Sequence, residues 1–488
     1  MRTRRHGFVR ATATIAALSV VAAACGSDDD EADSGDDAAE AESADADAGD
    51  DAGGDAGEDA GGDSGDAETP EGGEINVIIV GNPQMEDIAE LTPELFTAET
   101  GISVNYSILE EGTLREIVTR DAAAGGDQFD VVMVGMFDTP QFGANGWLQD
   151  LTPLAEASDT YDLDDLIPSV RGGLSVDGAL YSSPFYAESS FLMYRADVIE
   201  EAGLTMPDAP TWAVVAAIAR AIDSDEMAGI CLRGKPGWGD LGASFTTVLN
   251  TFGGTWWEAN DDGSIGAAQV DQPEFREALQ FYVDLIDDAG QNDAANSSFN
   301  ECLSQYQDGQ VAMWYDATVA AGILEADDSP VQGLNDFALA PTNVTDTSGW
   351  LWSWNLGIPT NSPNPDLAWE YIEWATSPGY IANAGELISG GWAAIPPGTR
   401  FSTYEIAEYQ SAAESFGQKT LDAMDAAPID DPGTTPRPGL PGVQYVGVPE
   451  FQDLGNQCTE LFSSVIAGGT SIDDALSQCQ DIASGFSS

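Results

Sequence analysis

Three strand-like segments alternate with helical segments in the stretch from residue 74 to residue 134. Residues 74–80, EINVIIV, are almost continuously apolar, which is typical of a strand buried on both faces. Residues 101–107 and 129–134 have strand patterns too, and residues at helical spacing separate the three segments. This order predicts an α/β fold with a parallel sheet covered by helices on both faces. Ligands of such sheets bind at the carboxyl ends of the strands, so the loops that begin at Gly81 and Gly135 are candidate site segments.

The middle of the chain is predicted to be more helical, with short strands between the helices. A segment rich in Pro and Gly, residues 427–449, is predicted to be an extended loop before the last two helices. Helices are expected at 197–202, 211–222, 273–288 and 302–307, and short strands at 178–181, 191–194, 311–314 and 355–358.

The first 25 residues have the pattern of a secretory signal. Four arginines precede an uncharged, apolar or small stretch at 11–24 that is too short to span a bilayer stably. Residues 21–25, VAAAC, resemble the bacterial lipobox, in which the cysteine thiol receives a lipid. We therefore expect a signal peptide at 1–24 and lipidation of Cys25, and the alternative is an ordinary signal followed by a chance cysteine. A double-chain lipid would anchor the protein stably at a membrane.

Residues 25–74 follow as a strongly acidic segment. They include 21 Asp and Glu and no Lys or Arg, and the other residues are mostly Ala, Gly and Ser. Such a segment cannot bury enough apolar surface to offset its ordering entropy, so it is predicted to be a disordered tether. The whole chain has a formal net charge of −69, which excludes a nucleic-acid partner because phosphate neutralisation needs a basic face.

Few catalytic side chains are available. The only histidine is His6, within the predicted signal peptide, so Ser-His-Asp catalysis and His-ligated metal sites are excluded for the mature chain. Lysine occurs only twice, as Lys235 and Lys419. We expect no catalytic residue, no metal site and no cofactor.

Four further cysteines suggest two disulfides, because thiols of exported proteins are usually oxidised. Four cysteines allow three connectivities. We favour Cys231 with Cys302 and Cys458 with Cys479, since the second pair lies in one local helical hairpin. Buried free thiols are the alternative.

Several motifs resemble a known family. The most specific are residues 184–190 (PFYAESS), 231–239 (CLRGKPGWG), 250–254 (NTFGG) and 313–318 (MWYDAT). With the order of segments over most of residues 75–488, they resemble the extracellular solute-binding proteins of ATP-driven (ABC) importers, family 1. Within that family the resemblance is to sorbitol- and mannitol-binding proteins.

The resemblance implies a two-lobe periplasmic-binding-protein-like fold of type II, with a ligand cleft between lobes joined by crossover hinge segments. The crossings would lie near 184–190, 337–341 and 392–396. The first lobe would then comprise residues 75–185 and 342–393, and the second lobe residues 190–336 and 397–488.

A polyol pocket needs carboxylates and amides for the hydroxyls, an arginine, and flat aromatic walls. Each candidate has a structural alternative: the tryptophans could be core residues, Asp316 a helix cap, Arg233 or Glu188 half of an ion pair, and the loop residues caps of helices. If residues 350–354 form a strand, Trp350, Trp352 and Trp354 share a face, whereas Trp256 and Trp257 face opposite sides. The predicted ligand-binding residues are Asn82, Gln84, Phe137, Asp138, Tyr186, Glu188, Arg233, Trp238, Trp256, Asp316, Trp352 and Trp392.

These features together predict a lipid-anchored binding protein at the outer face of the cell membrane. It would capture a sugar alcohol or monosaccharide as a monomer, close over it, and deliver it to the transmembrane permease subunits of an importer. An importer component for oligosaccharides or amino acids is the first alternative, since Arg233 and Asp316 could hold an amino acid. A secreted glycoside hydrolase, which needs only two carboxylates, is the second.

Overall fold

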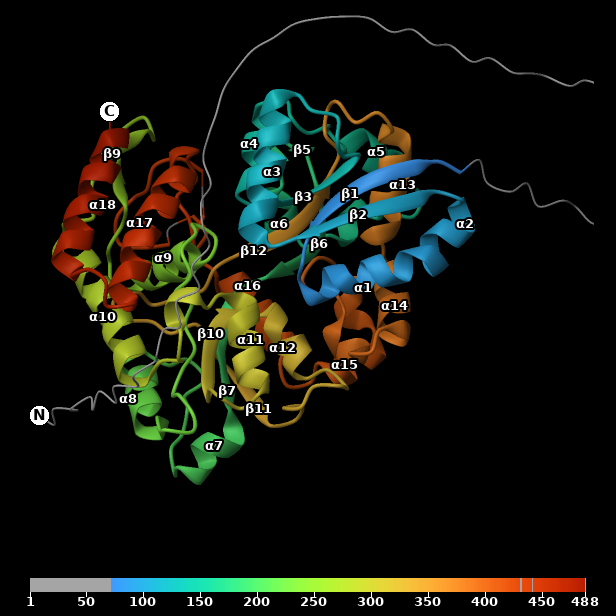
Figure 1. The fold of residues 1–488 in the computed structure, drawn as a ribbon. Coiled ribbons are helices and arrows are strands. Elements are labelled where there is room, and N and C mark those ends of the chain that lie inside the picture. The colour runs from blue at the N-terminus through green and yellow to red at the C-terminus, as the bar shows by residue number, and fades with distance from the viewer. Residues whose placement is uncertain (1–71, 431, 441, 488) are drawn as a thin grey trace, which may run out of the picture. The chain divides into compact units, whose positions relative to one another are not determined.

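The computed structural model describes residues 72–430, 432–440 and 442–487, all of which belong to one compact unit (Figure 1). The predicted signal peptide, Cys25 and all but the last residues of the predicted tether lie outside the described residues. Glu74, the last residue of that tether, opens strand β1 (Glu74–Val80). No helix among the described residues is both long and apolar enough to cross a membrane.

A five-stranded sheet in the order β2-β1-β3-β12-β6 forms the first of two main sheets (Figure 1). Strands β1, β2 (Ser103–Leu109) and β3 (Val131–Gly135) are parallel, as predicted. Strand β12 (Trp352–Gly357) comes from much later in the chain and pairs antiparallel with both β3 and β6 (Ser183–Glu188). The strand expected at 355–358 therefore begins three residues earlier and includes two tryptophans.

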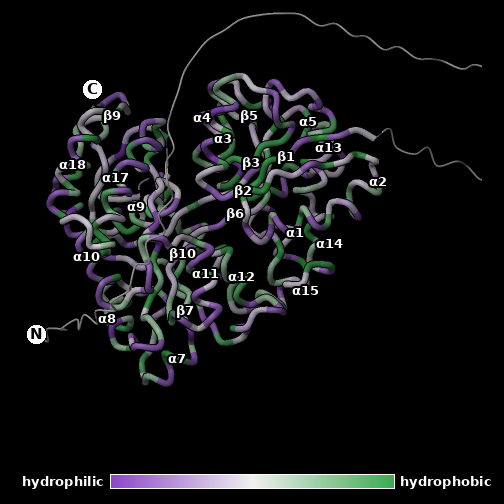
Figure 2. Tube along the Cα trace, in the orientation of Figure 1, coloured by the Kyte–Doolittle hydropathy of each residue, from purple (hydrophilic) through white to green (hydrophobic). Residues whose placement is uncertain are grey.

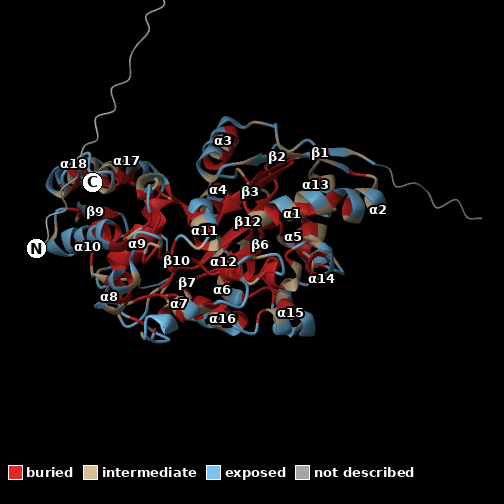
Figure 3. Ribbon diagram, turned by 60° about the horizontal axis from the view of Figure 1, so that its bottom comes forward, coloured by how far each residue is buried: buried red, intermediate tan, exposed pale blue. Residues whose placement is uncertain are grey.

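Helices cover this sheet, and we call the sheet with the elements packed on it the first lobe. Figure 3 shows the strands β3, β12 and β6 buried and the outer sides of the helices exposed, whereas the edge strand β2 is partly exposed. Besides the strands, the first lobe contains α1 (Pro83–Thr92), the π-helix Pro93–Thr97, α2 (Ala98–Thr100), α3 (Glu111–Ala124), α4 (Asp138–Ala144), α5 (Thr152–Ala157), α6 (Pro168–Gly173), the hairpin β4 (Ser175–Val176) and β5 (Ala179–Leu180), α13 (Pro365–Ala375), α14 (Pro378–Leu387), and 3-10 turns at Leu163–Asp165, Gly391–Ala394 and Ser402–Glu405, against which α15 (Ala407–Ala412) packs.

A three-stranded antiparallel sheet in the order β10-β7-β11 is the centre of what we call the second lobe. In Figure 2 hydrophobic residues lie in the middle of its central strand β7, as they do along β1 and β3 of the first lobe. The second lobe contains β7 (Ser190–Arg195), α7 (Ala196–Glu201), α8 (Trp212–Ile222), α9 (Leu241–Thr251), β8 (Trp257–Ala259), β9 (Ile265–Ala268), α10 (Pro273–Ala289), the 3-10 turn Ala294–Asn296, α11 (Phe299–Gln307), β10 (Met313–Ala317), α12 (Val319–Leu324), β11 (Asn335–Leu339), α16 (Gly417–Ala426), α17 (Glu450–Ile466) and α18 (Ile472–Phe486).

The chain passes between the two sheets at Ser189 and again between β11 and β12. Strands β6 and β7 belong to different sheets and are separated only by Ser189, and β11 leads from the second sheet to β12 of the first. Near the third predicted crossing the structure differs. The Arg400 side chain donates to the carbonyl oxygen of Thr376, and the Phe401 N–H donates to that of Asp165. Residues 399–402 are thus bonded to first-lobe residues, and the predicted boundary at 397 is too early.

Two disulfides join the second lobe in the predicted connectivity. Cys231 is bonded to Cys302, and Cys458 to Cys479. The second bond connects α17 and α18, the helical hairpin that favoured this pairing.

Candidate functional site

A cavity lies between the two lobes and has an empty volume of about 460 Å³. Its walls combine charged, amide and aromatic side chains from segments far apart in the sequence. The lining residues are Asn82, Glu111, Arg115, Tyr186, Glu188, Trp352 and Trp354 from the first lobe, Arg233, Trp238, Gly239, Ala243, Phe299, Ala317 and Gln444 from the second, and Trp350 from the segment before β12.

Tryptophans form the aromatic wall of the cavity. Trp352 and Trp354 project from the same face of β12, with ring centroids 5.7 Å apart, and Trp350 lies two residues before Trp352. Alternate positions of a strand point to the same side, so the predicted common face is confirmed for Trp352 and Trp354, and Trp350 lines the same cavity from the segment before the strand. Trp238 approaches from the second lobe, and its ring centroid lies 6.2 Å from that of Trp352. Such rings offer flat apolar surface to the C–H groups of a carbohydrate.

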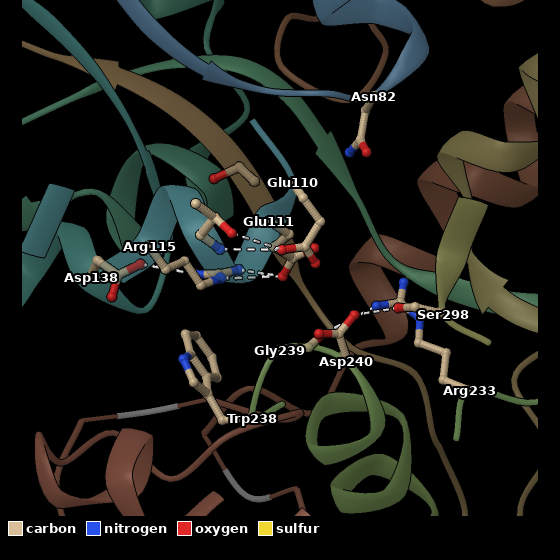
Figure 4. A network of polar contacts seen from close by, with 12 residues as sticks. Asn82, Glu110, Glu111, Arg115, Asp138, Arg233, Trp238, Gly239, Asp240 and Ser298 are labelled. Carbon is tan, nitrogen blue, oxygen red and sulfur yellow. Dashed lines mark hydrogen bonds and ion pairs between the residues drawn. The ribbon is translucent and has the colours of Figure 1, made fainter. Parts of the chain in front are cut away.

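Arg115 stands at the centre of this wall, and it was not among the predicted site residues. Its guanidinium carbon lies 4.3 Å, 5.0 Å and 4.6 Å from the ring centroids of Trp238, Trp352 and Trp354. Figure 4 shows the guanidinium between two carboxylates: Glu111, one helical turn earlier on α3, at 2.8 Å, and Asp138 at 3.0 Å. Burial raises the pKa of the Asp138 carboxyl, and the positive charge of Arg115 opposes this shift. Asp138 thus positions Arg115 and does not line the cavity.

Arg233 lines the second-lobe side and is held by Asp316. Arg233 Nε donates to Asp316 Oδ2 at 2.8 Å, Nη2 donates to Oδ1 at 2.5 Å, and Nη1 donates to the Gly239 carbonyl oxygen at 3.1 Å. Asp316 is fully buried at the end of β10, where Trp314 Nε1 also donates to it. The predicted ligand residue Asp316 is therefore the partner of Arg233, and it is outside the cavity lining.

Glu188, at the end of β6, has one carboxylate oxygen without a partner. Oε2 is buried and makes no hydrogen bond with any described residue, and the side chain is 5% exposed. Burial raises the pKa of Glu188 well above its usual range, while nearby Arg233 acts in the opposite direction. Gln444 Oε1 is buried and without a hydrogen bond in the same way, and so is Trp350 Nε1, which lies near enough to the Glu188 carboxyl to lower its pKa. Buried polar atoms are nearly always paired, so these three mark positions for ligand or water.

The first strand-end loop contributes Asn82. This residue is the N-cap of α1 by position, but its side chain makes no capping bond and donates instead to the Tyr186 hydroxyl at 3.1 Å. Both residues line the cavity, so β1 and β6 deliver their carboxyl ends to it, as the sheet geometry predicts.

The structure brings together six of the predicted ligand residues: Asn82, Tyr186, Glu188, Arg233, Trp238 and Trp352. Four others lie elsewhere for packing reasons. Gln84 is buried on α1, Phe137 packs behind Trp238 at 4.6 Å between ring centroids, and Trp256 is fully buried. Trp392 lies against Gly385 beside a separate groove. The ring of Trp256 is surrounded by Phe245, Phe275, Phe451 and Phe462.

The lining residues that the sequence analysis missed had weak signals. Glu111 and Arg115 are spaced four apart on a predicted helix, a common surface pattern. Gln444 lies in the segment rich in Pro and Gly, where no periodicity indicates direction. Six other lining residues were not predicted as ligand residues either, although Trp350 and Trp354 were expected to face the same side as Trp352. They are Gly239, Ala243, Phe299, Ala317, Trp350 and Trp354.

Comparison with known proteins identifies the family. The sequence profile of the bacterial extracellular solute-binding proteins matches residues 82–382. The chain belongs to this family. A mannitol-binding protein of Pseudomonas aeruginosa is 38% identical over 417 residues, which cover 84% of this chain and 92% of the relative. An erythritol/L-threitol-binding protein of Mycolicibacterium smegmatis is 25% identical and covers 71% of this chain and 74% of its own.

Among solved structures, a solute-binding protein of an ABC transporter from Agrobacterium vitis S4 with bound D-mannitol has a TM-score of 0.80 and 43% identity, covering 84% of this chain and 97% of its own. A maltose-bound protein of T. maritima, 21% identical with a TM-score of 0.69, shares the fold. The predicted family resemblance and the two-lobe α/β fold are thus confirmed. Members of this family are extracellular binding proteins of ABC importers.

Proposed function

We propose that this solute-binding protein captures a sugar alcohol, with D-mannitol as the first candidate, in the cavity between its lobes. The observation that carries the proposal is the set of unpartnered buried atoms on the cavity wall. Gln444 Oε1 is an acceptor, Trp350 Nε1 is a donor beside the Glu188 carboxyl, and Glu188 Oε2 accepts when that carboxyl is ionised and can donate when it is protonated. A hydroxyl group both donates and accepts, so a polyhydroxylated ligand matches all three.

The charges of the cavity favour a neutral ligand. Arg115 and Arg233 are the cationic residues of the described lining, and each is already bonded to carboxylates. An amino acid would need an unpaired cation for its carboxylate. Arg233 and Asp316, which the sequence offered as an amino-acid site, satisfy each other instead.

The similar proteins support the choice among neutral ligands. Two of them, at 38% and 43% identity, are described by their binding of mannitol. Both relatives favour a single small polyol over an oligosaccharide as the ligand.

The remaining features of the proposal concern delivery. The cavity takes residues from both lobes, so a ligand contacts both only in the closed arrangement, and binding shifts the population toward it. We propose that the closed protein then docks on the permease subunits as a monomer, and that Cys25 carries the lipid anchor at the outer face of the membrane. In this account the protein performs no catalysis, and the lobes divide near the predicted boundaries apart from the one at 397.

Thermal unfolding of the protein against a ligand panel tests the proposal. A ligand present at one hundred times its Kd adds about 2.7 kcal/mol of stability. We expect stabilisation by D-mannitol or a closely similar polyol and none by amino acids. Stabilisation by longer glycans alone would contradict the proposed sugar alcohol and indicate an oligosaccharide ligand. No stabilisation by any ligand of the panel would contradict the proposal as a whole.

A further inference from the structure

One ion pair joins the two lobes directly. Lys235 Nζ, in the second lobe, lies 2.6 Å from Glu110 Oε1, in the first. The other ion pairs found among residues 72–430, 432–440 and 442–487 each connect residues of a single lobe. The pair lies at the boundary between the lobes and outside the cavity lining. It therefore connects the two lobes without contacting a ligand in the cavity.

Both partners are held in place by their own lobes. Glu110 sits at the turn from β2 to α3 and accepts a hydrogen bond from the Thr113 backbone N–H at 3.2 Å. The Lys235 backbone N–H donates to the Ser297 carbonyl oxygen at 3.0 Å. Lys235 belongs to the loop that carries Arg233 and Trp238 into the cavity, so one loop both lines the cavity and bonds to the opposite lobe.

The surrounding charges make this lysine unusual. It is one of two lysines in a chain with 84 acidic residues. Glu111 of the first lobe, which is paired with Arg115, and Asp240 of the second lobe line a groove on the same boundary, and Figure 4 shows both carboxylates. Closing the lobes brings these two carboxylates together, and the Lys235–Glu110 pair is an attraction at the same place that offsets their repulsion.

We infer that the Lys235–Glu110 ion pair keeps the closed, ligand-loaded state together and so slows ligand release. This inference rests on the proposed function, because it requires a ligand in the cavity. The pair forms only when the lobes meet, so its loss accelerates opening and leaves the folding of each lobe unchanged. Exposed pairs of this kind contribute modestly, which corresponds to an acceleration of about 1.5- to 5-fold.

Stopped-flow measurement of D-mannitol release from the full protein tests the inference. Lys235→Gln should release the ligand about 1.5- to 5-fold faster than wild type, with a similar association rate and the same melting temperature without ligand. Lys235→Glu, which places two carboxylates together, should release it faster still. Asp288→Asn, which breaks the exposed Arg220–Asp288 pair within the second lobe, is the matched control and should behave as wild type.

The charge-swapped protein separates the ion pair from other effects of substitution. Glu110→Lys combined with Lys235→Glu restores the attraction and should bring the release rate back toward wild type, which a merely structural role of either residue would not produce. Unchanged release from Lys235→Gln and Lys235→Glu, or no recovery in the swapped protein, would overturn the inference. If wild type binds no polyol at all, it is the proposed function that fails.

Discussion

Asp316→Asn is the substitution that most sharply separates the structural from the ligand-binding residues of the site. Asp316 is fully buried and lies outside the cavity lining. It neutralises the buried guanidinium of Arg233 through two hydrogen bonds. Asparagine keeps the shape but removes the charge. Breaking a buried ion pair at one partner costs about 3–5 kcal/mol, because the other charge stays buried without compensation. We expect that loss in the free energy of unfolding of the ligand-free protein, measured by urea denaturation.

A double variant provides the control. Arg233→Met with Asp316→Leu removes both charges, and apolar replacements of a whole buried pair are often neutral or stabilising. It should be more stable than Asp316→Asn but less stable than wild type, because Trp314 Nε1 loses its acceptor, and it should lose ligand affinity, since Arg233 lines the cavity. An Asp316→Asn protein as stable as wild type would refute the reasoning, and so would a double variant that binds ligand normally.

Three further predictions concern pH, a disulfide and the backbone. Burial and the charge of Glu111 raise the pKa of Asp240 from 3.8 to about 6. The protonated carboxyl therefore stabilises the folded state below pH 4, and this stabilisation is lost as the pH rises through 6. Asp240→Asn should flatten the pH profile of the melting temperature between pH 4 and 6. Replacing Cys231 and Cys302 by Ala removes the disulfide that spans 71 residues and should destabilise the protein by about 4 kcal/mol relative to wild type in urea denaturation without reductant. Gly398→Ala should lower the melting temperature by several degrees, because Gly398 has φ +77° and an added Cβ would lie 2.0 Å from a carbonyl oxygen of β6.

The sheet and part of the site could be predicted because local patterns determine them. The apolar run at 74–80 identifies β1, and the carboxyl end of that strand locates Asn82. The spacing of two between Trp352 and Trp354 indicates one shared face in a strand, whichever other strands it pairs with.

The rest depends on contacts between distant segments, which local patterns do not contain. Asp316 bonds to a residue 83 positions away, and nothing near either residue indicates the pairing. Arg115 lies four residues after Glu111 on a helix, a spacing that is equally common on protein surfaces. Its burial depends on Trp352 and Trp354 of β12, a strand from much later in the chain. Trp256 follows a Gly-Gly turn typical of a loop, yet phenylalanines from three helices surround it.

A crystal structure of the protein with D-mannitol tests the central claim most directly. We expect one mannitol molecule in the cavity between the lobes, with its hydroxyls bonded to Glu188 Oε2, Trp350 Nε1 and Gln444 Oε1. Mannitol bound at another place, or bound in the cavity while these three atoms stay without a partner, would contradict it.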